Sequence, residues 1–498
     1  MLKIIVCLLV LAGFPSVLYA QNRQITFPRI VPEQRALEYF ALTQRNNNLS
    51  WEELAEISLW ASGDTTLSAM PRIRDAVNAL HNSGGLPVSG RERAEFILTF
   101  LHGNILRAYS LYQTRVDTVF TNGRFNCVSS SVLYMILSTS AGINTSGVIT
   151  RDHAFIIAHI DGQDIDVETT NRFGFDPGNR REFHDEFGRV TGFAYVPAQN
   201  FRDRQTISQI ELISVIFNNR IVQAERQNRF VEAVPLAVDR TAMLLGDLSS
   251  ANRFESQGSE SIFADPRREL LDRLINYGAS LLRSNREEDA LRWAIAASAV
   301  YPAPDRWPEF IMTSVNNRIV RFMRDRRIVD ARNFLESHRL FLSPDELIRL
   351  DSIVVDAELL HAARGITDVD EGNIIIEAIV LAQTNNRLDD RRAAELITFA
   401  VQRTSAIIRA PPNHDWRAAI IFIENAVSRF GTNRDWEQTL QTYRSNLAAD
   451  YHNRFAAAWN SQNFDEATRI LNEGLAEFPN DRQLLSNRAI VNRRQQQN

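Results

Sequence analysis

Residues Asn122 to Gly178 carry the most specific pattern in the chain and read NGRFNCVSSSVLYMILSTSAGINTSGVITRDHAFIIAHIDGQDIDVETTNRFGFDPG. It opens on a turn and then places a cysteine, Cys127, at the start of a mostly apolar run that stops at Ala141-Gly142. The length of this run and its glycine end favour a buried helix, capped by Gly142, over a strand. Unpaired N–H groups and the helix dipole favour a thiolate at such a helix start.

Two short runs, 153–160 and 163–169, flank the dipeptide Asp161-Gly162, which is a strong hairpin signal. With Asp161 and Gly162 as the two central turn residues, Ile160 pairs with Gln163 and Ile157 pairs with Asp166. Side chains alternate along a strand, so one face of the hairpin carries His153, Phe155, Ile157, Asp164, Asp166 and Glu168. A helix start thus supplies a thiol and a sheet supplies an imidazole and a carboxylate, the groups of a Cys-His-Asp catalytic centre.

At these residues the sequence resembles the transglutaminase-like branch of the papain-like superfamily. The shared order is a cysteine at a helix start, Gly142-Ile143 after that helix, a histidine opening a strand and an aspartate on the next strand. The resemblance implies Cys127 as nucleophile, His153 as general base and acid, and Asp166 as the group that orients the imidazole. It also implies an α+β domain of helices and a small antiparallel sheet over residues 21–200, with its core at 91–197.

Two departures from the family pattern leave parts of the site open. The family usually follows its aspartate closely with Pro-Thr, whereas Asp166 is followed here by Val-Glu-Thr, so Glu168 and Asp164 are alternative third members. The aromatic residue common beside the family's cysteine is absent, which leaves the oxyanion-hole partner unassigned.

Length and charge bound the class of protein. A chain of 498 residues is long enough for two or three domains. A formal net charge of -5 and the lack of a basic block give no reason to expect nucleic acid as a partner.

Residues 1–20 have the pattern of a secretory signal, with Lys3 at the charged end and Leu18-Tyr-Ala20 before the cleavage point. We therefore expect an exported protein, periplasmic or secreted, with no membrane span after signal removal. Cys7 would leave with the signal, so Cys127 would be the one cysteine of the mature chain and could form no internal disulfide. The alternative to a reactive thiol is a buried, inert cysteine.

The region 205–498 is predicted to be almost continuous helix, which makes the chain predominantly helical. Several segments place a small residue early in the second of two amphipathic stretches, as at Ala233, Ala290, Ala331 and Ala467. This pattern resembles degenerate tetratricopeptide repeats, which implies a protein partner on this region. A generic helical bundle is the alternative. Further upstream, the apolar spacing predicts a long helix from Arg91 to Tyr112.

No cofactor or metal is expected. His159 and His184 share no metal-ligand spacing with other residues, and phosphate-binding glycine loops are absent. The sequence therefore predicts an exported, cysteine-dependent acyl-transfer enzyme acting on a protein or peptide, with amide hydrolysis ahead of cross-linking. The alternatives are a catalytically idle domain in a protein-binding scaffold and, third, a cell-wall peptide hydrolase, whose usual Asp-Cys-Ser-Gly is here Asn126-Cys-Val-Ser129.

Overall fold

The computed structural model describes residues 26–45, 49–151, 153–178, 181–192, 204–246, 265–411 and 414–495. The predicted signal at 1–20 lies outside these residues. The chain forms two compact units, one up to Ser314 and one from Val315 onward. It is predominantly helical with a small antiparallel sheet, which confirms the coarse fold class. The predicted domain division at 200–205 does not coincide with the boundary between the units, because the helices that follow it pack into the first unit.

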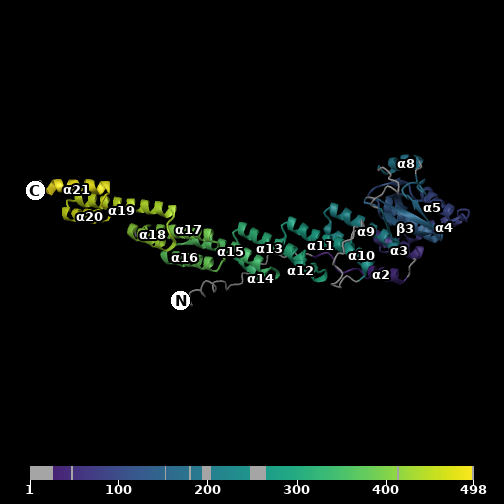
Figure 1. The fold of residues 1–498 in the computed structure, drawn as a ribbon, viewed down its shortest axis with the longest axis horizontal. Coiled ribbons are helices and arrows are strands. Elements are labelled where there is room, and N and C mark those ends of the chain that lie inside the picture. Colours follow the sequence, from purple (N-terminus) through teal and green to yellow (C-terminus); the bar gives the residue numbers. More distant parts are fainter. Residues whose placement is uncertain are drawn as a thin grey trace. The chain divides into compact units, whose positions relative to one another are not determined.

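Four helices lead into the first unit: α2 (Gln34–Arg45), α3 (Trp51–Ser62), α4 (Met70–Asn82) and α5 (Gly90–Asn104). The start of α3 is a capping box in which the Ser50 side chain accepts from Glu53 N–H and the Glu53 side chain accepts from Ser50 N–H. α3, α4 and α5 all pack against the helix α7 (Cys127–Ser140), in the part of Figure 1 that also holds the strand β3 (Asn144–Ile149).

The predicted helix Arg91–Tyr112 is too long, since α5 ends at Asn104. The chain then forms β1 (Ala108–Tyr109), which pairs in parallel with β2 (Arg124–Phe125) after the short helix α6 (Val116–Asn122). Gly123 makes this turn possible with a φ of 70°, because a Cβ there would lie 2.7 Å from the Cγ of Arg107. Pairing with β2 therefore outweighs the apolar spacing that favoured helix.

The helix α7 (Cys127–Ser140) occupies the centre of the first unit. Every side chain from Cys127 to Ser138 is buried, and the helix packs against α3, α5, β3 and β4 (Ala154–Ile160). Gly142 follows it with a φ of 75°, as the sequence predicted for its C-terminal end.

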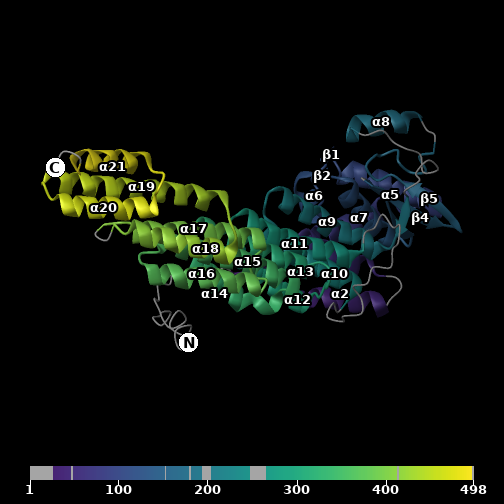
Figure 2. The same cartoon turned by 60° about the vertical axis from the view of Figure 1, so that its left-hand side comes forward.

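The sheet has the strand order β5-β4-β3-β6 and is antiparallel throughout, with β5 at Gln163–Val167 and β6 at Gln205–Ile207. The hairpin prediction is confirmed, since Ile160 pairs with Gln163 and Ile157 pairs with Asp166. Asp161 and Gly162 have φ values of 50° and 78°, as the two central residues of a tight hairpin turn require. In Figure 2 the helix α8 (Arg181–Thr191) lies at the margin of this unit.

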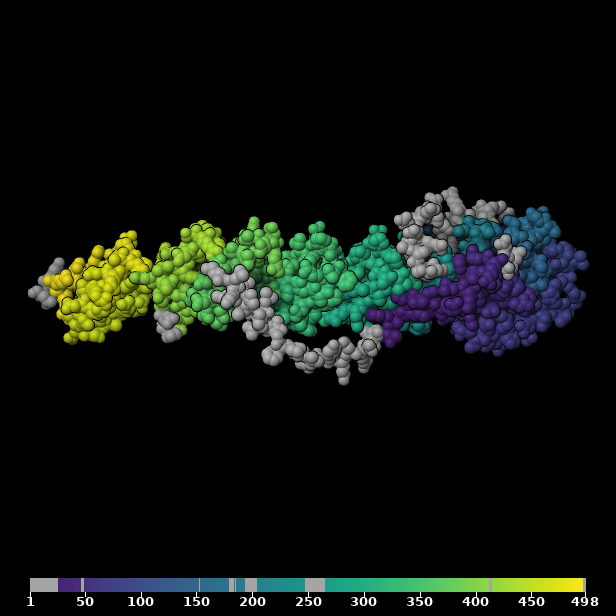
Figure 3. All heavy atoms as spheres, turned by 90° about the horizontal axis from the view of Figure 1, so that it is seen from below, coloured from purple at the N-terminus to yellow at the C-terminus, as the bar shows by residue number. Residues whose placement is uncertain are grey.

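Helices continue the first unit after the sheet: α9 (Gln209–Arg226), α10 (Phe230–Leu245), α11 (Pro266–Arg283) and α12 (Glu287–Val300). α9 packs against α3, α7 and β3, and α10 packs against α2 and α9. The first described residues, which begin at residue 26, also contact these helices. Phe27 lies against Trp293 with ring centroids 5.7 Å apart, and Arg29 donates to both carboxylate oxygens of Asp239. Figure 3 shows this purple segment along the teal helices.

The second unit is helical. Its elements, beginning with the helix that crosses the boundary, are α13 (Trp307–Arg324), α14 (Ile328–His338), η3 (Arg339–Phe341), α15 (Pro344–Gly365), α16 (Val369–Thr384), α17 (Asp390–Ile408), α18 (Trp416–Phe430), α19 (Arg434–Asn460), α20 (Phe464–Glu477) and α21 (Arg482–Gln495). One apolar core cluster runs through it from Val355 to Val491.

One turn recurs between helices in both units. Its central residue has a φ between 55° and 60°, and the next residue donates its N–H, over 2.8–3.0 Å, to the carbonyl five residues earlier; the central residues are Asn228, Asn285, Arg326, Asn386 and Gln462. In four cases an alanine that is at most 1% exposed lies five residues further on, at Ala233, Ala290, Ala331 and Ala467. These are the small residues that the sequence pattern singled out.

Candidate active site

Cys127 is the first residue of α7 and is buried, with 9% of its surface exposed. The preceding residue, Asn126, caps the helix: its Oδ1 accepts from the N–H groups of Val128 and Ser129 at 3.1 and 3.0 Å. Ser129 Oγ accepts from Asn126 N–H at 2.9 Å, which completes a reciprocal box. The thiol therefore lies where the dipole of α7 favours negative charge.

The loop after β1 holds this cap in place. Asn126 Nδ2 donates to the Leu111 carbonyl at 3.1 Å, and Ser129 Oγ donates to the Gln113 carbonyl at 2.9 Å. Helix α9 in turn holds the loop, because Gln223 Nε2 donates to the Tyr112 carbonyl at 2.8 Å. The position of the cysteine thus depends on a helix nearly a hundred residues further along the chain, which sequence reasoning assigned to a separate region.

His153 comes directly before β4, where its carbonyl accepts from Thr150 N–H at 2.9 Å. Its Nε2 donates to Glu168 Oε2 at 2.6 Å. The imidazole is 16% exposed and the Glu168 side chain only 1% exposed. The rings of Phe155 and Phe187 lie near the imidazole, with ring centroids 6.2 and 5.7 Å away.

The protonation of His153 follows from its neighbours. Burial lowers its pKa, but attraction to the Glu168 carboxylate and hydrogen bonds to Cys127 and Glu168 outweigh burial and raise the pKa well above 6.5. Since Nε2 is bonded to Glu168, Nδ1 is the ring nitrogen left for the Cys127 thiol. The structure therefore brings the predicted cysteine and histidine together.

The carboxylate beside the imidazole is Glu168, not the predicted Asp166. Glu168 Oε1 also accepts from Thr170 N–H at 3.1 Å and from Thr170 Oγ1 at 2.6 Å, so both of its oxygens are engaged. The backbone of Glu168 is fixed by Gly174, whose carbonyl accepts from Glu168 N–H at 2.8 Å. A Cβ on Gly174 would lie 2.0 Å from the Glu168 carbonyl oxygen, so this approach requires glycine.

Strand register explains the correction. Asp166 pairs with Ile157, four residues beyond His153, which places it about 13 Å along the strand from the histidine. Its carboxylate binds Arg204 instead, with Nη1 to Oδ2 at 2.7 Å. Asp164 is further still and binds His159 Nδ1 at 2.7 Å. Glu168 lies two residues from the position opposite His153, and its longer side chain spans that offset.

A layer of hydroxyl groups ties the Glu168 loop to the cysteine helix. Thr169 Oγ1 lies 2.8 Å from Ser130 Oγ and 2.9 Å from Ser131 Oγ, both on α7. His102 Nε2 donates to the Thr169 carbonyl at 3.0 Å, and burial lowers the pKa of His102 to about 4, so this imidazole is neutral. Tyr109 lies close by, and burial together with the charges of Cys127 and Glu168 raises the pKa of its hydroxyl.

A cavity of about 330 Å³ opens beside the thiol and the imidazole. One wall is the loop residues Leu111 and Tyr112, whose side chains are otherwise exposed. Another part of the lining comes from the helices after the sheet, chiefly Val222, Gln223 and Arg226 of α9. The cavity therefore gives a reactant access to Cys127, and residues beyond 205 shape it.

Among the residues that the structure describes, no three His, Cys, Asp or Glu side chains gather in a way that could hold a metal ion. Over the same residues, no helix combines the length and the apolar character needed to cross a membrane. Neither the models of known protein families nor the curated proteins give a match to this chain.

Proposed function

We propose that the chain is a cysteine-dependent acyl-transfer enzyme of transglutaminase-like type, with Cys127 as nucleophile, His153 as general base and acid, and Glu168 as the group that orients the imidazole. The observation that carries the proposal is the 2.6 Å bond from His153 Nε2 to buried Glu168, with Cys127 and His153 lining the same cavity. This is the arrangement in which a base activates a nucleophile and a third group orients the base.

In this reaction the sulfur of Cys127 attacks an amide carbonyl and forms a tetrahedral adduct, while His153 holds the thiol proton. The proton then passes to the departing amine as the C–N bond breaks, which leaves a thioester. Water or a second amine attacks the thioester, gives its proton to His153 and returns the sulfur to its starting state. We propose water as the acceptor and therefore hydrolysis of a peptide or amide bond; amine transfer is the second outcome.

The start of α7 supplies a donor for the oxyanion. Asn126 accepts from the N–H groups of Val128 and Ser129, so neither is free to bind a substrate oxygen. The N–H of Cys127 itself is the remaining donor of this first turn beside the sulfur, and the dipole of α7 adds to its effect.

We test the site by the rate of Cys127 alkylation with iodoacetamide between pH 5 and 9. The expected result is fast reaction at pH 6 that is lost in His153→Ala and in Glu168→Gln and retained in Asp166→Asn. Asp166→Asn is a matched control, because it neutralises a carboxylate on the same strand that does not contact the imidazole. Slow reaction at pH 6 that neither His153→Ala nor Glu168→Gln changes would refute the proposal.

The products of the reaction distinguish hydrolysis from amine transfer. Incubation with a peptide mixture and mass spectrometry distinguishes cleaved or deamidated peptides, the products of water, from peptides that have gained an added primary amine. Cys127→Ala serves as the blank. We expect the products of water.

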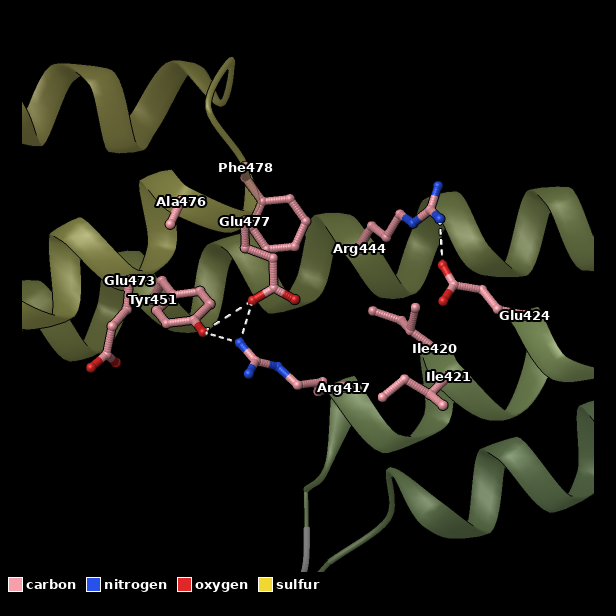
Figure 4. A pocket seen from close by; sticks show the side chains of 10 residues that line it. All are labelled: Arg417, Ile420, Ile421, Glu424, Arg444, Tyr451, Glu473, Ala476, Glu477 and Phe478. Atoms are coloured by element: carbon pink, nitrogen blue, oxygen red, sulfur yellow. Dashed lines mark hydrogen bonds and ion pairs between the residues drawn. The ribbon is translucent and has the colours of Figure 1, made fainter.

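We also propose that the helical region consists of tetratricopeptide-like repeats and that the second unit recruits a protein substrate. The recurring turn and the buried alanines after it support repeat character. A groove of about 840 Å³ between α18, α19 and α20 supports recruitment. Figure 4 shows Arg417 pointing toward Tyr451 and Glu477 at one end of this groove, with Ile420 and Ile421 toward the other.

The groove joins an exposed apolar side chain to fixed charges, as protein-binding surfaces do. Ile421 is 49% exposed, and Arg417 Nη2 donates to Tyr451 Oη at 2.6 Å and also binds Glu477. We expect Ile421→Asp to slow cleavage of a protein substrate and to leave iodoacetamide labelling of Cys127 unchanged. Equal rates of cleavage by the wild-type protein and by Ile421→Asp would refute the proposal that this groove recruits the substrate.

Export, from the signal pattern at 1–20, is part of the same proposal. N-terminal sequencing of the secreted or periplasmic protein should begin at Gln21.

A further inference from the structure

The cavity beside Cys127 has a charge opposite to that of the chain. Its described lining carries three arginines, Arg151, Arg226 and Arg240, and one carboxylate, Glu269. Glu269 is already bound to Arg240, and the chain as a whole has a formal net charge of -5. Among the residues that the structure describes, Arg151 and Arg226 therefore leave an excess of positive charge in this cavity beside the thiol.

Each of the two arginines lies next to an element that shapes the site. Arg226 is the last residue of α9, the helix that packs against α7 and holds the loop beside Cys127. Arg151 follows β3 in the turn that leads to His153, a turn closed by the bond from Thr150 N–H to the His153 carbonyl. One charge thus comes from the sheet side of the cavity and one from the helical side.

None of the acids that the structure describes pairs with these arginines. Both guanidinium groups belong to exposed residues, and no carboxylate of the described chain forms an ion pair with either. The nearest acids along the chain from Arg226 have other partners: Glu225 lies 3.4 Å from Arg273, and Glu232 binds Arg229. A cavity lined by unpaired cations of this kind concentrates anions.

We propose that the site selects acyl substrates that carry a carboxylate close to the bond that is attacked, such as peptides with aspartate or glutamate beside the reacting residue, and that Arg151 and Arg226 make this selection. The inference rests on the proposed function, since it names the substrate class of the same thiol. Guanidinium groups suit the task because they bind carboxylates with two parallel hydrogen bonds and stay charged at any physiological pH.

Two alkylating reagents of nearly equal size test the selection at Cys127. Iodoacetate carries a carboxylate and iodoacetamide is neutral, and the ratio of their rates on the urea-unfolded chain corrects for their intrinsic chemistry. In the folded protein we expect the corrected ratio to exceed one at low salt and to fall roughly threefold to tenfold in Arg226→Gln and in Arg151→Gln. The ratio should also fall in 1 M salt, where the Debye length is about 3 Å.

Two control variants test whether the ratio of rates depends on the charge of the cavity arginines. Arg226→Lys keeps the charge and should keep most of the ratio. Arg74→Gln removes one exposed arginine on α4, outside the cavity, and should leave the ratio unchanged, which separates a local effect from a change in total charge.

The outcomes separate this inference from the function on which it rests. Fast, His153-dependent reaction with iodoacetamide, together with a ratio that neither cavity arginine changes, overturns the selection and leaves the enzyme proposal intact. Slow, His153-independent reaction with both reagents overturns the two together. A ratio that falls in the two cavity variants but not in Arg74→Gln supports the selection. A peptide of alternating alanine and glutamate should then protect Cys127 at lower concentration than one of alanine and lysine; the reverse order would also overturn it.

Discussion

Replacement of Glu168 by glutamine should remove the proton from Nε2 of His153. The glutamine can keep its carbonyl oxygen on Thr170, which places its amide N–H₂ against His153 Nε2. Two donors then face each other unless the imidazole gives up its Nε2 proton. The variant therefore favours a neutral imidazole with its proton on Nδ1, the nitrogen left for the thiol, and the thiol cannot transfer its own proton there.

The size of the effect follows from the contact that is lost. A hydrogen bond to a charged group is worth about 1.5–3 kcal/mol, and burial of Glu168 at 1% exposure keeps solvent from replacing it. Since 1.36 kcal/mol corresponds to a factor of ten, the fraction of thiolate at pH 6 should fall roughly ten- to a hundredfold.

The assay is the pseudo-first-order rate of iodoacetamide labelling at pH 6, read by mass spectrometry of the peptide that holds Cys127. Circular dichroism and the denaturation midpoint confirm that the variant is folded. A rate within a factor of two of wild type in folded Glu168→Gln would refute the reasoning, because it would show that the imidazole holds its charge without this carboxylate. Loss of the rate in Asp166→Asn would refute the choice of Glu168 over Asp166.

Three further predictions concern stability and the supports of the site. In a Cys127→Ala background, which removes the thiol from titration, the raised folded pKa of His153 stabilises the protein fully below about pH 6.5, and this stabilisation is lost as pH rises through the folded value. The difference in urea midpoint between Cys127→Ala and the double variant with His153→Gln should therefore shrink from pH 6 to pH 9. A difference that stays constant over this range would contradict the raised pKa. Asn126→Ala removes the cap of α7 and should destabilise the first unit by about 1 kcal/mol, or up to ~2 kcal/mol, and slow labelling of Cys127; an unchanged midpoint would mean that the cap contributes nothing. Gly174→Ala would put a Cβ 2.0 Å from the Glu168 carbonyl oxygen, so it should lower the free energy of unfolding by about 1–3 kcal/mol and displace the Glu168 carboxylate. Gly103→Ala, on α5 with nothing within 4 Å of the new Cβ, should be neutral or stabilising by up to ~1 kcal/mol. Urea midpoints and labelling rates measure both effects, and equal behaviour of the two variants would contradict the packing argument.

Local chemistry made much of the candidate site readable from the sequence. The turn Asp161-Gly162 requires two positive φ values, so it determines the hairpin register, and the pairing of Ile157 with Asp166 follows from it. The same register contains the signal that Asp166 is too far from His153, because each residue along a strand adds about 3.3 Å. Family order suggested Asp166, and strand geometry favours Glu168.

Other features could not be read locally because they depend on contacts between distant segments. The helix predicted up to Tyr112 ends at Asn104, since the N–H of Arg107 finds its partner in the Gly123 carbonyl across the intervening α6. The apolar pattern of residues 91–112 gives no information about the Gly123 carbonyl, which competes with the helix for a backbone N–H.

Local sequence is sufficient for the elements that end or turn on their own residues: the cysteine at the start of α7, the glycine after its last turn, the β4–β5 hairpin, and the alanines that follow four of the recurring turns. Contacts between distant segments hold Glu168 against the imidazole and bring α9 to the cavity. Glu168 is placed by a loop tied to Ser130 and Ser131 through Thr169, and α9 reaches the site through Gln223. The physical reason is range: turns and caps are satisfied within a few residues, whereas a buried charge and a cavity wall need groups that only the folded chain brings together.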